Sequence, residues 1–470
     1  MNIFYLTPLR RTGLVAVAAL MLNACAPAQD TPTPTTSVNV SRYVAVGDSY
    51  TAGVSAGGLT RTSQEYSFPN LIARQLQGAS ANAAFTQPLL EAGTGSGYFD
   101  LVDYPASGIP RTRRIAGQAV RRTVINPTAC GGPDTVRLLE RSKTASALPQ
   151  NLGVPGLLLS QIETAGLGNE TKATPGGAFN PYFERLLPAA DSRTYLQAVT
   201  DAAATATFFT YFQGLDDLLP YVRSGGECGP FPNTSLTNLM KANARKVLDR
   251  LRAGGQPGII AKLPALNTLP LLRLGKGLQL QARLQALNND KALLYIEDPI
   301  NLGPAQPITD DDYVLATAIP RVGKLTPVLV GTTTLMLPYG RDARNPLRDA
   351  DVLDNFQELQ RAKSVLDAYN NELENLAHNV YRLPEVDITN HRSALDLDGI
   401  LFNNVADIIS VNGVVYSSEP VRGNFFSLDY YSLTPRGNGL VANAFISAIN
   451  KAYRANIPAV DVNNLPTVAH

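Results

Sequence analysis

A serine follows an apolar run near the start of the chain, in the stretch YVAVGDSYTAG at residues 43–53. The run is typical of a strand that ends in a tight turn, which would expose Ser49 as a nucleophile. A serine hydroxyl attacks poorly at neutral pH unless a nearby base removes its proton. The chain has only three histidines, His378, His391 and His470, so the source of this base is the first question that the sequence raises.

The first two histidines belong to different predicted elements. The clearest helix is predicted over residues 352–380, and His378 lies off its apolar stripe, four residues after Glu374, which favours a solvated pair on the outer face. His391 follows a predicted strand in EVDITNHRSAL; it either reaches the active edge of a sheet or is a solvated loop residue, the simpler interpretation. The stripe of the helix consists of Val352, Phe356, Leu359, Leu366, Tyr369, Leu373, Leu376 and Val380.

The elements that must position these residues alternate along the chain. Short apolar, β-rich runs (YVAVGD, TATFFTYFQG, GIIAKLPAL, ALLYIED and EVDIT) are separated by helical segments, and the last of these is GLVANAFISAINKAY at 439–453. The alternation predicts one elaborated α/β domain with a mainly parallel sheet and helices on its faces. Long Gly/Pro-rich segments at 77–150 and 265–345 would form either a cap over the carboxyl edge of the sheet or a surface for a partner.

The N-terminus indicates an exported protein. Residues 1–24 have two arginines, a short apolar core and small residues before Cys25, as in a secretory signal peptide. The ending LNAC resembles the bacterial lipobox, which implies that Cys25 is lipidated and tethers the protein to a membrane; the alternative is an ordinary signal peptide with an incidental cysteine. Residues 25–40 are a Pro/Thr-rich spacer, 41–460 the folded body and 461–470 a C-terminal tail.

Composition and residue spacing argue against two classes of function, nucleic-acid binding and metal binding. The 40 basic and 39 acidic residues give a net charge of +1 without a basic run, which disfavours nucleic-acid binding. Cys130 and Cys228 lie in Gly/Pro-rich loops without metal-ligand neighbours, so they are either a disulfide or two free thiols rather than a zinc site. The acidic run at 310–312 lacks the ligand spacing of a calcium loop, and no metal is expected.

Four separated blocks, in order, carry a family resemblance: VGDSYTAG, NLGVPG at 151–156, QGLDD at 213–217 and SLDYYSLTPRGNGLVANAFISAIN at 427–450. Together they resemble the SGNH, or GDSL-type, hydrolases, in particular longer secreted bacterial lipases and esterases. The resemblance implies a three-layer α/β/α sandwich without a cofactor. It also implies Ser49 as the nucleophile and an oxyanion hole formed by the backbone N–H groups of Ser49 and Gly156 and a side-chain amide in the third block.

The chain departs from that pattern at two positions. Asp216 stands where the family has the oxyanion-hole asparagine, and an ionised carboxylate only accepts hydrogen bonds. The family's final Asp-x-x-His motif is Asp429-Tyr430-Tyr431-Ser432 here, so the orienting Asp429 is kept while Ser432 replaces the base. A serine hydroxyl does not accept a proton at neutral pH, and loss of the base removes most catalysis by such a triad.

Two functions therefore follow from the resemblance. The first is a catalytically impaired lipoprotein of the cell envelope that acts as a binding or assembly component, with an acyl-ester, lipid or glycan ligand or an envelope protein as partner. The second is an active serine ester hydrolase that uses Ser49 with an atypical base, for which His391, Tyr430, Tyr431 and Asp216 are the candidates.

Overall fold

The computed structural model describes residues 37–79, 85–126, 134–141, 147–173, 178–189, 191–298, 303–354, 356–388 and 409–469, all within the unit Pro34–His470. Cys25, Cys130, His391 and His470 lie outside these ranges. The signal peptide, the lipidation and the roles considered for those two histidines therefore stay predictions. Among the helices that the structure describes, none is long and apolar enough to cross a lipid bilayer.

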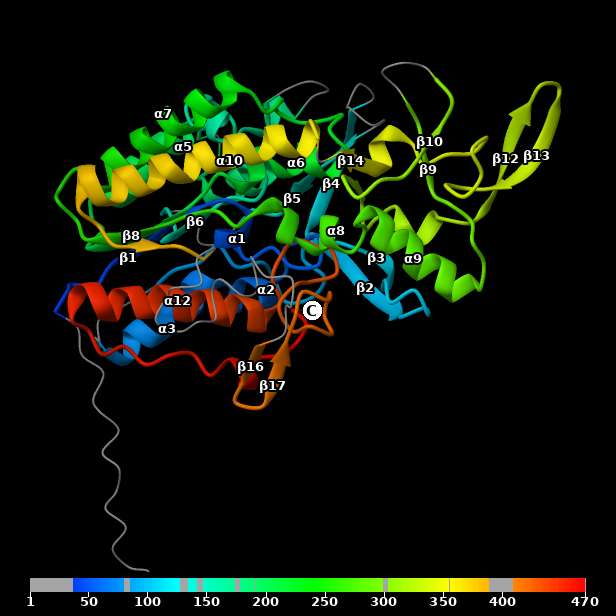
Figure 1. The fold of residues 1–470 in the computed structure, drawn as a ribbon. Helices are drawn as coiled ribbons and strands as arrows, with labels where there is room; N and C mark the ends of the chain where they lie inside the picture. Colours follow the sequence, from blue (N-terminus) through cyan, green and yellow to red (C-terminus); the bar gives the residue numbers. More distant parts are fainter. Residues whose placement is uncertain are drawn as a thin grey trace, which may run out of the picture. The chain divides into compact units, whose positions relative to one another are not determined.

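Five parallel strands form the central sheet (Figure 1). In spatial order they are β15 (Glu385–Val386), β8 (Gly258–Ala261), β7 (Phe208–Phe212), β1 (Tyr43–Gly47) and β6 (Asn151–Gly153). All residues of β1, β6, β7 and β8 are buried, as expected for parallel strands that are covered on both faces. The predicted α/β class with a parallel sheet is confirmed.

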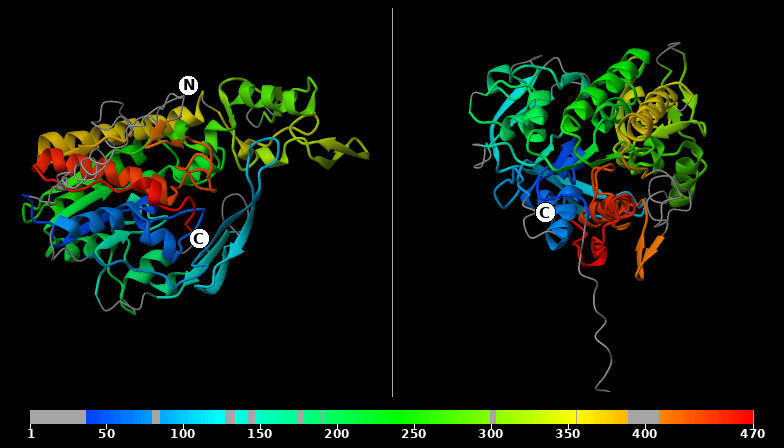
Figure 2. Two further views of the ribbon diagram at one scale, coloured as in Figure 1. Left: turned by 90° about the horizontal axis from the view of Figure 1, so that it is seen from below. Right: turned by 90° about the vertical axis from the view of Figure 1, so that its left-hand side faces the viewer.

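Helices lie on both faces of this sheet (Figures 1 and 2). The helices α3 (Phe68–Ala79) and α12 (Pro435–Tyr453) pack together on one face, where the rings of Phe68 and Phe445 stack with centroids 5.0 Å apart. The other face carries α5 (Tyr195–Ala203), α7 (Thr234–Leu251) and α10 (Glu358–Asn375). The predicted final helix corresponds to α12, whose N-terminus is capped by the hydroxyl of Thr434.

Two predicted elements are wrong in part. The helix predicted over 352–380 begins only at Glu358: Val352–Asp354 form strand β14, paired with β11 (Asp312–Val314), and Phe356 is 80% exposed. Its end is a π-helical turn over Leu376–Tyr381. The run ALLYIED contains only a two-residue strand, β9 (Tyr295–Ile296), which pairs antiparallel with β10 (Gln306–Pro307) and does not join the central sheet. Apolar composition marked both segments as regular structure but did not specify their pairing partners.

The two long Gly/Pro-rich segments contain hairpins and short helices. Segment 77–150 holds the hairpins β2–β3 and β4–β5, and segment 265–345 holds α8, α9 and the hairpin β12–β13. The remaining short elements are α1, α2, α4, α6 and the hairpin β16–β17. The bounds are β2 (Gly97–Asp103), β3 (Arg111–Ala116), β4 (Val120–Asn126), β5 (Asp134–Leu139), α8 (Pro270–Arg273), α9 (Gly277–Asn288), β12 (Leu325–Val330), β13 (Thr333–Pro338), α1 (Ser49–Ala52), α2 (Arg61–Glu65), α4 (Pro181–Leu186), α6 (Leu219–Arg223), β16 (Ile409–Val411) and β17 (Val414–Tyr416).

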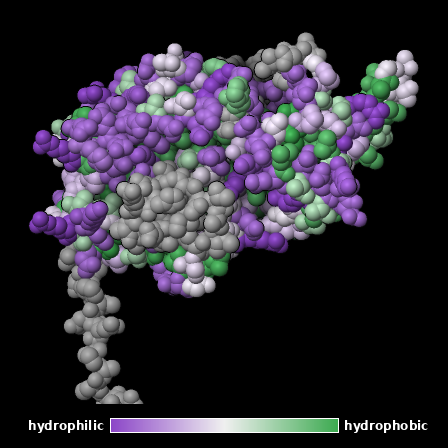
Figure 3. Space-filling view, in the orientation of Figure 1, coloured by the Kyte–Doolittle hydropathy of each residue, from purple (hydrophilic) through white to green (hydrophobic). Residues whose placement is uncertain are grey.

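The hairpin β12–β13 extends away from the central sheet and carries apolar side chains on its surface (Figures 1 and 3). Leu325, Leu329 and Met336 are 62%, 71% and 57% exposed. Leu325 and Leu329 alternate along β12 and share one face of the hairpin with Met336, which follows from the two-residue period of a strand.

Candidate functional site

The site lies at the carboxyl ends of the three neighbouring strands β6, β1 and β7. After β1 the chain forms β6 on one side of that strand and then β7 on its other side. Open α/β sheets bind ligands where the strand order reverses in this way. Ser49 follows β1, Gly156 follows β6 and Asp216 follows β7, so the fold brings three of the predicted site residues together. Gly47 permits this approach, since a Cβ there would lie 2.2 Å from the carbonyl oxygen of Phe212.

One carboxylate oxygen of Asp216 occupies the centre of this site. Its Oδ2 accepts hydrogen bonds from the backbone N–H of Ser49 at 3.1 Å, from the Ser49 hydroxyl at 2.5 Å and from the backbone N–H of Gly156 at 2.7 Å. Gly156 presents its N–H from a left-handed conformation with φ of 70°, which favours glycine. The two backbone donors that the sequence predicts for an oxyanion hole are therefore both used by a side chain of the same chain.

Two further buried carboxylates fix the loop that carries Asp216. Asp48 Oδ2 accepts hydrogen bonds from the N–H groups of Gly214, Leu215 and Asp216 at 2.9, 3.0 and 3.3 Å. Both carboxylate oxygens of Asp217 lie 3.0 Å from the N–H of Leu159, in the loop after β6. The three aspartates thus connect the loops after β1, β6 and β7.

Burial controls the ionisation of these aspartates. It raises the pKa of Asp48 and Asp216, and the negative charge of Asp216 raises the pKa of Asp48 further. Hydrogen bonds from Ser49 and Gly156 oppose the rise at Asp216. Burial also raises the pKa of Asp217 to about 8, although the hydrogen bond from Leu159 opposes this. The site therefore holds protons more tightly than three solvated carboxyls would.

The final block forms a closed hydrogen-bonded loop around Asp429. The hydroxyl of Ser432 donates to Asp429 Oδ2 at 2.6 Å, and the backbone N–H groups of Ser432 and Tyr431 donate to Oδ1 at 2.9 and 3.2 Å. The N–H of Gly57 donates to Oδ2 at 2.6 Å. Ser432 is fully buried, and none of its hydrogen bonds within the described ranges reaches Ser49. The carboxylate that would orient a catalytic base instead organises this loop.

This geometry predicts a structural phenotype for Asp429. The substitution Asp429→Ala leaves the backbone N–H groups of Gly57, Tyr431 and Ser432 without their acceptor; the last two are buried, and each buried group costs about 1–3 kcal/mol. We expect the free energy of unfolding to fall by about 2–6 kcal/mol, measured by urea denaturation. Ser432→Ala is the matched control, because it removes one of the four hydrogen bonds and is expected to cost about 1 kcal/mol. Equal losses in the two variants would contradict the proposed role of Asp429.

The histidine that the structure describes is remote from this chemistry. His378 is exposed in the π-helical turn after α10, as predicted. The predicted pair with Glu374 is not formed: Glu374 instead lies 3.1 Å from the ammonium group of Lys262. Across the described residues, Ser49 has no imidazole partner.

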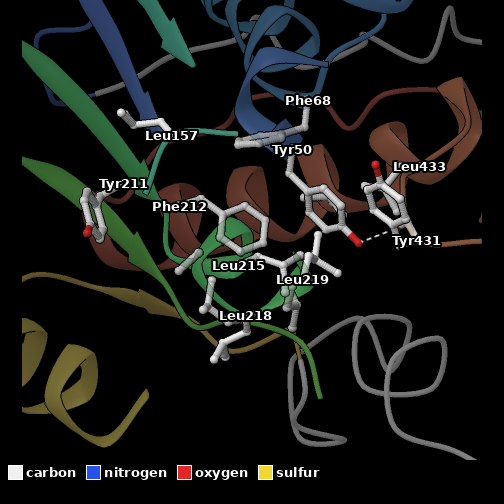
Figure 4. Packing of buried hydrophobic residues seen from close by; sticks show 14 of the residues in the cluster. Tyr50, Phe68, Leu157, Tyr211, Phe212, Leu215, Leu218, Leu219, Tyr431 and Leu433 are labelled. Carbon is white, nitrogen blue, oxygen red and sulfur yellow. Dashed lines mark hydrogen bonds between the residues drawn. The ribbon is translucent and has the colours of Figure 1, made fainter. Parts of the chain in front are cut away.

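A cavity of about 230 Å³, named cavity A here, opens beside Ser49. Arg223 lies over the ring of Tyr431, 4.9 Å from its centroid, and its Nη1 is 3.4 Å from the tyrosine hydroxyl. The hydroxyl of Tyr50 donates to the backbone oxygen of Tyr431 at 2.5 Å and fixes that segment (Figure 4). The residues lining cavity A are Ser49, Val54, Gly57, Gly58, Pro155, Gly156, Leu158, Tyr182, Asp216, Leu219, Pro220, Arg223 and Tyr431.

The tyrosines considered as alternative bases are unsuited to that role. Burial raises the pKa of Tyr431 far above neutrality and that of Tyr430 to about 12. The hydroxyl of Tyr430 faces the backbone oxygen of Pro110 rather than Ser49. Asp216 is the candidate base that contacts Ser49 in the part of the chain that the structure describes.

Cys228 is disulfide-bonded, in agreement with the first of the two alternatives for this residue. Its partner lies outside the described residues, so the pairing with Cys130 stays a prediction. Over those same residues, no cluster of His, Cys, Asp and Glu side chains is arranged to hold a metal ion.

Comparison with protein-family models, with curated protein sequences and with solved structures finds no match for this chain.

Proposed function

We propose that this chain is a lipid-anchored protein of the cell envelope with an SGNH-type hydrolase fold, which binds an acyl or glycan ligand without cleaving it. The observation that carries the proposal is the position of Asp216 Oδ2, on which the N–H groups of Ser49 and Gly156 converge. The parallel sheet with helices on both faces supports the fold. The lipobox-like sequence before Cys25 supports the anchor.

Acyl transfer requires these backbone donors to be free for the substrate. They must stabilise the oxygen that becomes negative when Ser49 attacks a carbonyl, and loss of one such donor costs about 100- to 1000-fold in rate. Here an oxygen of Asp216 already occupies the position, and when ionised it also repels the developing oxyanion. A ligand carbonyl that enters cavity A therefore lacks stabilisation in the transition state.

One contact favours the second candidate function, an active serine ester hydrolase. The Ser49 hydroxyl donates to Asp216 Oδ2 at 2.5 Å, so Asp216 is placed to take its proton. Ser49 Oγ would then bond to the ester carbonyl carbon, the carbon–alkoxy bond would break, and the proton on Asp216 would pass to the leaving alcohol. Water would release the acyl group in a second step. This candidate requires Asp216 to leave the two backbone donors during the reaction.

A single assay separates the two candidates. The purified full-length chain and Ser49→Ala are incubated with p-nitrophenyl acetate and butyrate between pH 5 and 9 and with a fluorophosphonate probe. We expect identical background hydrolysis and no labelling of Ser49, because the donors are occupied and no imidazole contacts the serine in the described ranges.

Turnover or labelling that disappears in Ser49→Ala would overturn the proposal that the chain binds its ligand without cleaving it. In that case Asp216→Asn identifies the base: loss of turnover in this variant would assign the proton transfer to Asp216, since an amide does not accept the serine proton.

A further inference from the structure

A second cavity adjoins the first and differs from it in charge. It has a volume of about 330 Å³ and is named cavity B here. Gly57, Pro155, Gly156 and Tyr182 line both cavities, so the two adjoin. The residues lining cavity B are Gly57, Ser96, Arg114, Arg137, Leu139, Pro155, Gly156, Phe179, Asn180, Pro181 and Tyr182. They include two arginines and no carboxylate.

Several arginines in and next to the hairpins β2–β3 and β4–β5 are paired with acidic side chains. Arg113 lies 2.6 Å from Asp100, and Arg121 and Arg141 lie 2.7 and 3.0 Å from the buried Glu184. Acidic side chains were therefore available for ion pairs along these strands. Within the described residues, the two arginines that line cavity B and Arg122 on β4 lack such an ion pair.

Arg114 and Arg137 have no ion pair with any residue in the described ranges. The guanidinium of Arg114 is held in place, because its Nη1 donates to the backbone oxygen of Gly57 at 3.0 Å and its Cζ lies 5.1 Å from the centroid of the Phe99 ring. Burial and the like charge of Arg137 lower the pKa of Arg114. The carboxylate of Asp429 acts on Arg114 in the opposite direction but forms no ion pair with it, so an anion between the two arginines would relieve their mutual repulsion.

We infer that cavity B binds an oxyanion group, a phosphate or a carboxylate, of a larger ligand whose uncharged part extends into cavity A toward Ser49. The inference rests on the proposed binding function of cavity A. Guanidinium groups match the oxygen geometry of such anions and bind them with charge-assisted hydrogen bonds. Cavity A is lined by one acidic residue, Asp216, and one basic residue, Arg223, whereas the charged residues of cavity B are two arginines, so the anionic end of the ligand belongs in cavity B and its neutral end near Ser49.

Calorimetric titration of the full-length chain in buffer of low ionic strength tests this inference. The probes are phenyl phosphate, benzoate and the uncharged benzyl alcohol. We expect the two anions to bind and the alcohol not to bind, with tighter binding of the anion that the natural ligand carries. Arg137→Gln is expected to weaken binding of the preferred anion about tenfold, the loss of one charge-assisted contact.

Matched variants make the result specific. Arg137 is exposed and its side chain has no hydrogen bond within the described residues, so Arg137→Gln should leave the melting temperature unchanged. Arg113→Gln removes the same charge from the same strand as Arg114, but at a position paired with Asp100, and should leave the affinity within twofold of wild type. Arg114→Gln with Arg137→Gln should abolish measurable binding.

Three outcomes would overturn the inference: no binding of either anion, equal binding of the alcohol, or equal weakening by Arg113→Gln and Arg137→Gln. Failure of the proposed function is measured separately. Turnover of p-nitrophenyl esters that depends on Ser49 would overturn the non-hydrolytic role and leave the anion site standing, whereas absent anion binding without turnover would overturn only the anion site.

Discussion

A chain that carries both Asp216→Asn and Ser432→His is expected to hydrolyse p-nitrophenyl acetate at least about 1000-fold faster than the wild-type chain. A positioned general base contributes about 10²–10⁴-fold and one oxyanion donor about 10²–10³-fold, so the two together exceed this threshold. The two substitutions supply different groups to the same attack of Ser49 on the carbonyl carbon, a base and an oxyanion donor, which makes this the largest change in activity that the site predicts.

Each substitution has a specific structural reason. The amide that Asp216→Asn introduces is neutral, so it competes less for the N–H groups of Ser49 and Gly156 and can donate to a substrate oxyanion. A histidine at position 432 would take over the contact that the Ser432 hydroxyl now makes with Asp429 Oδ2 at 2.6 Å. That contact would orient the imidazole and stabilise its charged form.

Control variants define the outcome. Ser49→Ala added to the double variant should remove the gain, and each single substitution should give less than the pair, because a triad works as a unit. Circular dichroism and thermal melting establish that the variants are folded. A folded double variant without any gain would mean that the loop around Asp429 does not direct position 432 toward Ser49.

The second large effect is a loss of stability as the pH rises. The pKa of Asp217 increases from 3.8 to about 8 in the folded protein, chiefly because the carboxyl is buried. Between these two values the folded state binds a proton that the unfolded state has released, so the free energy of unfolding falls as pH increases. The contribution is fully present below about pH 4 and is lost through about pH 8, with a total on the order of 6 kcal/mol at about 1.4 kcal/mol per pKa unit.

Asp217→Asn removes this titration and keeps an oxygen that can accept the hydrogen bond from Leu159. We expect the stability of the variant relative to wild type to rise by about 2–4 kcal/mol between pH 5 and pH 8, measured by urea denaturation at both values. The variant must be compared with wild type at each pH, because burial also raises the pKa of Glu358 and Glu385 to about 7 and these groups change the stability of both proteins. Asp310→Asn, at an exposed loop position, should show no such rise, and parallel pH curves for wild type and Asp217→Asn would refute the assignment.

The sequence allowed the core of the fold to be predicted where its pattern was strong. The runs that became β1 and β7 are fully buried, and the three- to four-residue spacing of the last helix matches α12. The helix predicted from Val352 failed at its start, because an apolar residue fits a strand as well as a helix and the partner of β14 lies far away in the sequence. Phe356 belonged to the predicted apolar stripe by spacing alone and is largely exposed.

The motifs in the sequence indicated three residues that meet at the carboxyl edge of the sheet, and no motif indicated the arginines of cavity B. Ser49, Gly156 and Asp216 meet because they follow three adjacent parallel strands, which the order of the blocks indicated. The sequence suggested that Asp216 could not donate to an oxyanion, but not that its own oxygen would fill the hole. Arg114 and Arg137 could not be linked from the sequence, since they lie on two different hairpins and line one cavity only in the folded chain.

Asp48 accepts three hydrogen bonds from the loop after β7, which gives the Gly-Asp-Ser turn a structural role that does not depend on the reactivity of Ser49. Such a turn can persist after the chemistry is gone, because its removal would loosen the whole carboxyl edge of the sheet. Sequence searches that select enzymes by the Gly-Asp-Ser turn alone would therefore also select chains that share the scaffold and do not share the reaction.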